Sequence, residues 1–141
     1  MLVTVNPVPT ANIGAAPNAI CLVNSSTITY VGSATAAATY NWNFGGGTVL
    51  TGTGQGPYTV NFPAAGNYTV TLSVTELGCT SNGASTSVTV YGTPSSAFSI
   101  SVDTICSGET VTLNYTGNSS PVATYNWNVG SGIISSGSGQ G

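Results

Sequence analysis

The segment that decides the fold of this chain is Ala65-Gly66-Asn67-Tyr68-Thr69-Val70-Thr71-Leu72-Ser73-Val74-Thr75. Its apolar side chains alternate with Thr and Ser, which is the period-two pattern of a strand buried on one face. The pattern predicts a strand over residues 67–75. Tyr68 opens this strand directly after a Gly-containing turn, the position of a tyrosine corner in β-sandwiches.

The same alternation extends outward along the chain, with Gly, Pro and Asn in the gaps. It predicts seven strands, at residues 10–15, 25–31, 38–44, 47–51, 58–62, 67–75 and 84–91. Seven short strands within about 85 residues are typical of an all-β, antiparallel β-sandwich. The residues expected to point inward are Ile20, Ile28, Tyr30, Tyr40, Trp42, Phe44, Val60, Phe62, Tyr68, Val70, Leu72, Val74, Val88 and Val90.

An internal repeat organises the chain. Thr39-Tyr40-Asn41-Trp42-Asn43 recurs as Thr124-Tyr125-Asn126-Trp127-Asn128, an offset of 85 residues, and residues 1–56 align on 86–141 without a gap at 21 identities. We interpret residues 1–6 as the last strand of a preceding repeat, 7–91 as one complete repeat, and 92–141 as the incomplete first part of the next. The chain is therefore expected to be a fragment of a tandem array.

The composition excludes several functions. The chain has no Lys, Arg or His and only three carboxylates, Glu76, Asp103 and Glu109, whereas Ser, Thr, Gly and Asn make up 72 of its 141 residues. Nucleic-acid binding needs cationic side chains against phosphate. Triads, dyads and histidine-ligated metal sites need His. We expect no enzyme activity, no cofactor and no membrane insertion of this segment, since no run approaches the ~20 apolar residues of a membrane span.

Two segments make the sequence similar to the PKD (polycystic kidney disease) family of immunoglobulin-like repeats. One is Trp42-Asn43-Phe44-Gly45-Gly46-Gly47-Thr48, which resembles the family's W-D-F-G-D-G-T, and the other is residues 65–75, close to its A-G-x-Y-T-V-T-L-x-V-T. Both Asp positions of the first motif are replaced, by Asn43 and Gly46, so a calcium or other metal site there loses its carboxylates. The resemblance implies a non-catalytic, extracellular spacer or adhesive module.

The resemblance also extends to a pair of cysteines, Cys21 before the second strand and Cys79 after the sixth. It implies a Cys21–Cys79 disulfide, with Cys106, the repeat equivalent of Cys21, unpaired within this chain. In a simple immunoglobulin topology, however, these two loops lie at opposite ends, and a disulfide needs Cα atoms within about 7 Å. The alternatives are that the cysteines stay reduced or join neighbouring repeats.

The other candidate residues each allow a structural interpretation and a functional one. Tyr40, Trp42 and Phe44 share one face, which we interpret as core, with a sugar-stacking platform as the alternative. Tyr58 and Tyr91 are less clearly buried. Gly52-Thr53-Gly54-Gln55-Gly56 has no Lys after it and is read as a turn. Candidate glycosylation residues are Thr104, in the pattern Asp-Thr-aliphatic, and the four sequon residues Asn24, Asn67, Asn114 and Asn118.

These observations favour a structural or adhesive segment of a long extracellular bacterial repeat protein, a filament or adhesin stalk on the cell surface. Its expected partners are neighbouring repeats or identical filament chains, with surface glycans or proteins as candidate ligands. One alternative is an accessory carbohydrate- or protein-binding module of a secreted hydrolase. Another is a non-covalently polymerising fibre subunit, because residues 92–141 would expose sheet edges and core.

Overall fold

The computed structural model describes residues 1–120 and 122–139. The chain divides into two compact units, a first unit of Met1–Thr93 and a second unit of Pro94–Gly141. All the regular structure of the described residues is strand. None of them forms a helix with the length and hydropathy to cross a membrane.

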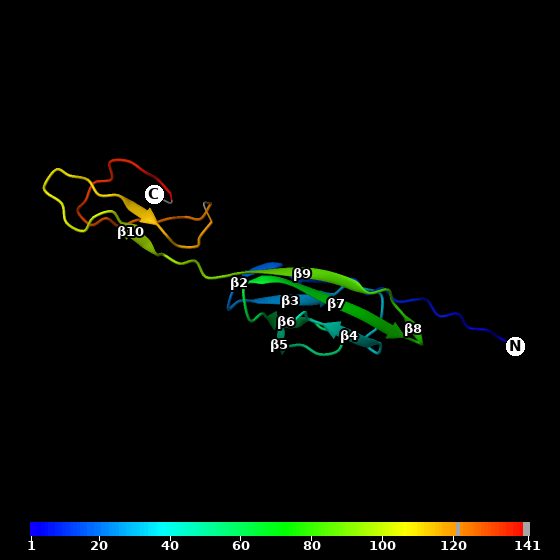
Figure 1. Cartoon of the computed structure of the whole chain (residues 1–141). Helices are drawn as coiled ribbons and strands as arrows, with labels where there is room; N and C mark the ends of the chain where they lie inside the picture. The colour runs from blue at the N-terminus through cyan, green and yellow to red at the C-terminus, as the bar shows by residue number, and fades with distance from the viewer. Residues whose placement is uncertain (121, 140–141) are drawn as a thin grey trace. The chain divides into compact units, whose positions relative to one another are not determined.

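The first unit is a sandwich of two sheets (Figure 1). One sheet has the order β1-β3-β6-β5, and the other has the order β2-β9-β7-β4 with β8 paired to β7. The strands are β1 (Ile13–Ala16), β2 (Ala19–Cys21), β3 (Ser25–Tyr30), β4 (Thr39–Asn43), β5 (Thr48–Thr51), β6 (Tyr58–Asn61), β7 (Gly66–Glu76), β8 (Cys79–Thr80) and β9 (Ala84–Tyr91).

All seven predicted strands are present, and two short strands, β2 and β8, were not predicted. β2 pairs with β9 in parallel, with Ile20 opposite Val90, whereas the other pairs in the sandwich are antiparallel. Between β1 and β2 the chain crosses at Pro17-Asn18 from one sheet to the other. Ser26 holds this crossing, because its buried hydroxyl donates a hydrogen bond of 2.7 Å to the carbonyl of Pro17.

The core lies between the two sheets, as the alternation predicts. In β3, β6, β7 and β9, residues at every second position are buried and those between them are more exposed, since successive side chains of a strand point to opposite faces. The predicted inward residues that are buried are Ile20, Ile28, Val60, Phe62, Val70, Leu72, Val74, Val88 and Val90.

The remaining predicted core residues are half-buried aromatics packed against the same core: Tyr30, Tyr40, Trp42, Phe44 and Tyr68. Tyr40 and Trp42 lie on β4, which is the outermost strand of its sheet, so their rings reach the rim. Tyr68 forms the predicted tyrosine corner, because its hydroxyl donates a hydrogen bond of 2.9 Å to the carbonyl of Ala64, four residues upstream. Tyr58 is buried and Tyr91 is 59% exposed.

The chain enters and leaves the first unit at opposite ends. Asn6 lies at the C-terminal end of β7, where its side-chain amide donates a hydrogen bond of 3.3 Å to the carbonyl of Leu77. Tyr91 lies at the N-terminal end of β7, one residue after Val90, which pairs with Gly66. Glu76 lies ten positions after Gly66 in β7, a length of about 33 Å along the strand. Figure 1 shows residues 1–6 leaving the sandwich beside β8, without forming a strand.

Among the described residues of the second unit there is one antiparallel strand pair, β10 (Phe98–Ile100) with β11 (Leu113–Tyr115), in which Phe98 is opposite Tyr115. Several of its large apolar residues are exposed. Ile105 is 41% exposed, whereas its counterpart Ile20 is 5% exposed and packs among residues of β6, β7 and β9.

Side-chain contacts of the first unit recur in the second at the offset of 85. The Tyr30 hydroxyl donates to the carbonyl of Thr10, and the Tyr115 hydroxyl to that of Ser95. The ring centroids of Tyr30 and Tyr40 are 5.1 Å apart, as are those of Tyr115 and Tyr125. Both units need a glycine after this tyrosine, at Gly32 and Gly117. A Cβ at Gly32 would lie 2.1 Å from the carbonyl oxygen of Thr10, and a Cβ at Gly117 would lie 2.2 Å from that of Ser95.

Candidate functional site

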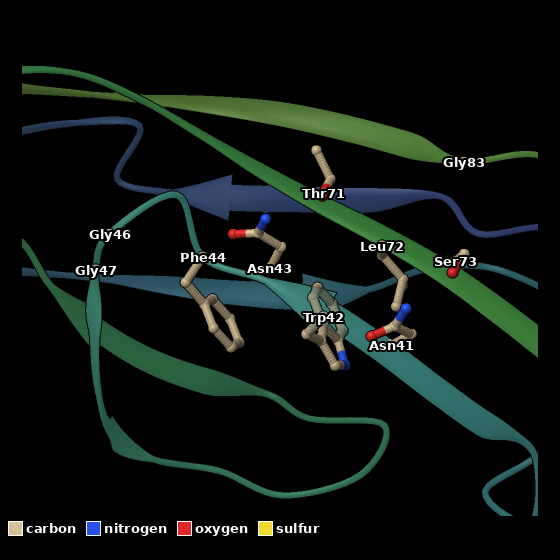
Figure 2. Close-up of a pocket in the computed structure, with 10 residues that line it drawn as sticks. All are labelled: Asn41, Trp42, Asn43, Phe44, Gly46, Gly47, Thr71, Leu72, Ser73 and Gly83. Carbon is tan, nitrogen blue, oxygen red and sulfur yellow. The ribbon is translucent and has the colours of Figure 1, made fainter.

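A shallow groove runs along the edge strand β4 where it meets β7 (Figure 2). Its walls are uncharged: polar groups come from the outward residues of both strands, and aromatic groups come from the end of β4. Because no lining residue is a carboxylate, cysteine, tyrosine or histidine, the groove can form hydrogen bonds and ring contacts but cannot transfer protons. The lining residues are Asn41, Trp42, Asn43, Phe44, Gly46, Gly47, Thr71, Leu72, Ser73 and Gly83.

The two aromatic rings of the groove belong to the core more than to the surface. Trp42 and Phe44 project to the same side of β4 and stack nearly parallel, with centroids 5.7 Å apart (Figure 2). Both rings pack against the ring of the buried Tyr58, whose centroid lies 5.3 Å from that of Trp42 and 5.0 Å from that of Phe44. The Trp42 indole N–H donates a hydrogen bond of 3.0 Å to the carbonyl of Gly54. The core interpretation of Tyr40, Trp42 and Phe44 therefore fits this geometry better than a sugar-stacking platform.

Tyrosine hydroxyls near the groove are held in their neutral form. Burial raises the pKa of Tyr58, and its hydroxyl donates a hydrogen bond of 2.9 Å to the carbonyl of Gly54. Burial, followed by the neighbouring Tyr30, raises the pKa of Tyr40. A raised pKa keeps each phenol protonated near neutral pH, so neither presents a phenolate as a general base.

The turn after β4, where the family motif has its aspartates, is closed by a side-chain amide. The Asn43 carbonyl oxygen Oδ1 accepts a hydrogen bond of 2.8 Å from the backbone N–H of Gly45, which has φ of 63°. Asn128 makes the same contact with Gly130, at 2.9 Å. Across residues 1–120 and 122–139, no three His, Cys, Asp or Glu side chains gather in one place.

Glu76 is the one carboxylate of the first unit, and a hydrogen-bond pair holds it ionised. The backbone N–H of Thr35 donates to Oε1 at 3.0 Å, and the Thr35 hydroxyl donates to the same oxygen. These two bonds lower the pKa of Glu76. Sequence reasoning missed this contact because 41 residues separate the partners, and no local pattern links them.

The predicted Cys21–Cys79 disulfide is wrong for this fold. All three cysteines are free. Cys21 ends β2 opposite Tyr91, and Cys79 begins β8 opposite Glu76, so the two lie at opposite ends of one sheet, about 33 Å apart along β7. A disulfide requires Cα atoms within about 7 Å. The connection between β1 and β2 crosses to the other sheet and does not run back along the sandwich.

The candidate glycosylation residues are all at the surface. Thr104, Asn24, Asn67, Asn114 and Asn118 are exposed, as a transferase acceptor must be. Two of the amides already accept hydrogen bonds: Asn67 from the Thr89 hydroxyl, at 2.9 Å, and Asn118 from the backbone N–H of Ser95, at 2.7 Å. Glycosylation of these residues stays a prediction.

The two packed sheets and the tyrosine corner define an immunoglobulin-like β-sandwich module. Residues 4–90 match the sequence profile of the PKD domain, which is well over half of the chain. The chain therefore belongs to the PKD-domain family, whose members are typically non-catalytic modules of extracellular and cell-surface proteins. Comparison with curated proteins gives no match.

Proposed function

We propose that this chain is a non-catalytic segment of a long bacterial surface protein, in which PKD-like sandwiches follow one another as the beads of a filament or adhesin stalk. The observation that carries the proposal is the path of the chain through the first unit. Asn6 lies beside Leu77 at one end of β7, and Tyr91 lies beyond Gly66 at the other. Repeats joined in this way advance by roughly the length of one sandwich, about 30–40 Å each.

Two further observations support a repeated unit. The hydrogen bonds of Tyr30, Tyr40 and Trp42 recur at Tyr115, Tyr125 and Trp127 with the same backbone partners at the offset of 85. The surface also suits an extended stalk. It lacks Lys and Arg, so trypsin-like proteases have no cleavage site, and attraction between charged surfaces is weak.

The mass of the native polypeptide, denatured and reduced, tests the proposal. A covalent stalk should give a mass many times the 14.0 kDa of this segment. A mass near 14.0 kDa would overturn it. Antibodies raised against the chain should also label intact, unpermeabilised cells, and labelling that needs permeabilisation would contradict the surface location.

One observation favours a second candidate, the non-covalently polymerising fibre subunit. Phe98, Ile100 and Ile105 of the second unit are 57%, 48% and 41% exposed. Strands donated by another chain could cover them. The same mass measurement separates the two candidates, because a polymerising subunit falls to its monomer mass on denaturation.

A further inference from the structure

The cysteines at the two ends of the first unit each lie beside a residue through which the chain joins the neighbouring repeat. This inference rests on the proposed stalk, since it concerns how one repeat is joined to the next. The relevant residues are Asn6, where the chain arrives, and Tyr91, where it leaves.

Cys79 lies against the arriving chain. Its sulfur Sγ is 3.7 Å from the backbone carbonyl oxygen of Asn6, and it is only partly buried. The Asn6 side chain points to the same turn, because its amide donates a hydrogen bond of 3.3 Å to the carbonyl of Leu77. Both the backbone and the side chain of residue 6 therefore contact the segment from Leu77 to Cys79.

Cys21 lies against the departing chain. It is paired with Tyr91 across the parallel β2–β9 ladder, and the next residue, Leu22, donates a backbone hydrogen bond of 2.7 Å to the carbonyl of Tyr91. Neighbouring strands are about 4.8 Å apart. Ile20 is buried, so Cys21, the next residue of the strand, points outward, and both it and Tyr91 are exposed.

Asn6 and Tyr91 occupy the same position of the repeat, because 6 + 85 = 91. In an array, Cys79 of one repeat therefore contacts the last strand residue of the preceding repeat. In that preceding repeat, Cys21 is paired with the same last strand residue. We propose that Cys79 of each repeat forms a disulfide with Cys21 of the preceding repeat. Cys106 is the equivalent of Cys21 in the second unit, so it would form the corresponding disulfide with the repeat that follows.

The reaction is an oxidation by thiol–disulfide exchange with a low-molecular-weight or protein disulfide. One cysteine thiolate attacks the donor disulfide and expels one donor thiolate, and the second cysteine thiolate then attacks the mixed disulfide and expels the other. Two cysteine thiols and one donor disulfide give one protein disulfide and two donor thiols. Such bonds persist in the oxidising surroundings of a surface protein. A junction closed in this way resists separation of the two sandwiches under tension.

The test extends the full chain by one repeat. A copy of residues 7–85 is placed directly before Met1, so that residues 1–6 serve as its last strand. The folded protein is oxidised with a mixture of oxidised and reduced glutathione, alkylated, cleaved after Glu and analysed by mass spectrometry. The expected product links Cys21 of the added copy to Cys79 of the original chain, with the other three cysteines alkylated.

Two variants of the original chain give matched controls. Cys79→Ser should abolish the linked peptide. Cys21→Ser should leave it unchanged, because the bond uses Cys21 of the added copy. A bond between Cys21 and Cys79 of one repeat, or five alkylated cysteines in a protein that unfolds as two sandwiches, would overturn the proposed disulfide and leave the stalk intact. If the added copy does not fold, the proposed stalk and the disulfide both fail.

Discussion

The indole N–H of Trp42 donates a hydrogen bond to the carbonyl of Gly54, with 3.0 Å between nitrogen and oxygen. This bond ties the edge strand β4 to the glycine-rich loop that follows β5, so it links the two sheets at one side of the sandwich. Trp127 and Gly139 form the same bond at the same distance. The glycine-rich loop thus has a structural role, as its sequence without a following Lys predicts.

Replacing Trp42 by Phe should weaken the first unit through this bond. The substitution keeps an aromatic ring against Tyr58 but removes the donor, leaving the carbonyl of Gly54 with the Tyr58 hydroxyl alone. Because the Gly54 carbonyl keeps one partner, the loss should cost about 0.5–1.5 kcal/mol, the net contribution of a typical hydrogen bond. Urea unfolding followed by circular dichroism should show a lower midpoint. Trp127→Phe is the matched control, and the first unit should keep its midpoint in that variant.

The alternation of residues 65–75 predicted the fold because it reflects burial directly. Val70, Leu72 and Val74 are the best-buried residues of β7, and the Thr and Ser residues between them face outward or lie at intermediate depth. Such a pattern depends only on the period of a strand, which is local. The core and the tyrosine corner at Tyr68 followed from it.

The features that the sequence could not reveal depend on long-range pairing. β2 has only three residues, too few for a visible alternation, and its parallel partner β9 lies about 70 residues away. The disulfide prediction failed for the same reason, since the fold alone decides which ends Cys21 and Cys79 occupy. The repeat alone shows that residues 6 and 91 are equivalent positions, because they are 85 residues apart. It does not show that Cys79 contacts Asn6, which depends on the fold.

Truncating Leu72 should destabilise the first unit strongly. This side chain is 1% exposed and packs in the cluster with Val74, Ala11 and Ala34. Leu-to-Ala substitution in a close-packed core costs about 2–5 kcal/mol, from lost transfer energy and the cavity that is left. The matched control is Leu50→Ala, since Leu50 is 54% exposed and should change the free energy of unfolding by no more than about 0.5 kcal/mol. Equal effects of the two substitutions would contradict the buried position of Leu72.

The stability of the first unit should fall in acid through Glu76. Its pKa is lowered in the folded state by the two hydrogen bonds from Thr35. A depressed folded-state pKa means that the unfolded state binds the proton more readily, so this contribution is present above the unfolded value of about 4.5 and is lost as the pH falls below it. Thermal unfolding between pH 7 and pH 3 measures the effect.

Glu76→Gln should flatten this acid dependence, because the amide has no charge to lose. Asp103→Asn is the control, since Asp103 lies in the second unit and the acid dependence of the first should persist in that variant. An unchanged pH profile in Glu76→Gln would show that the bonds from Thr35 do not favour the ionised carboxylate.

Val23 should be a site where a glycine stabilises the protein. Val23 has φ of 81°, a left-handed conformation that β-branched residues rarely adopt, and its side chain is 87% exposed. The repeat equivalent is Gly108, with φ of 93°. Left-handed backbone costs a residue with a Cβ roughly 1–2 kcal/mol, while the greater freedom of glycine in the unfolded chain costs about 0.5–1 kcal/mol. Val23→Gly should therefore raise the free energy of unfolding by about 0.5–1 kcal/mol, measured in urea.

Val23→Ala keeps a Cβ in the same conformation and should give a smaller gain or none. A destabilised Val23→Gly would mean that the Val23 side chain contributes contacts that outweigh its backbone strain.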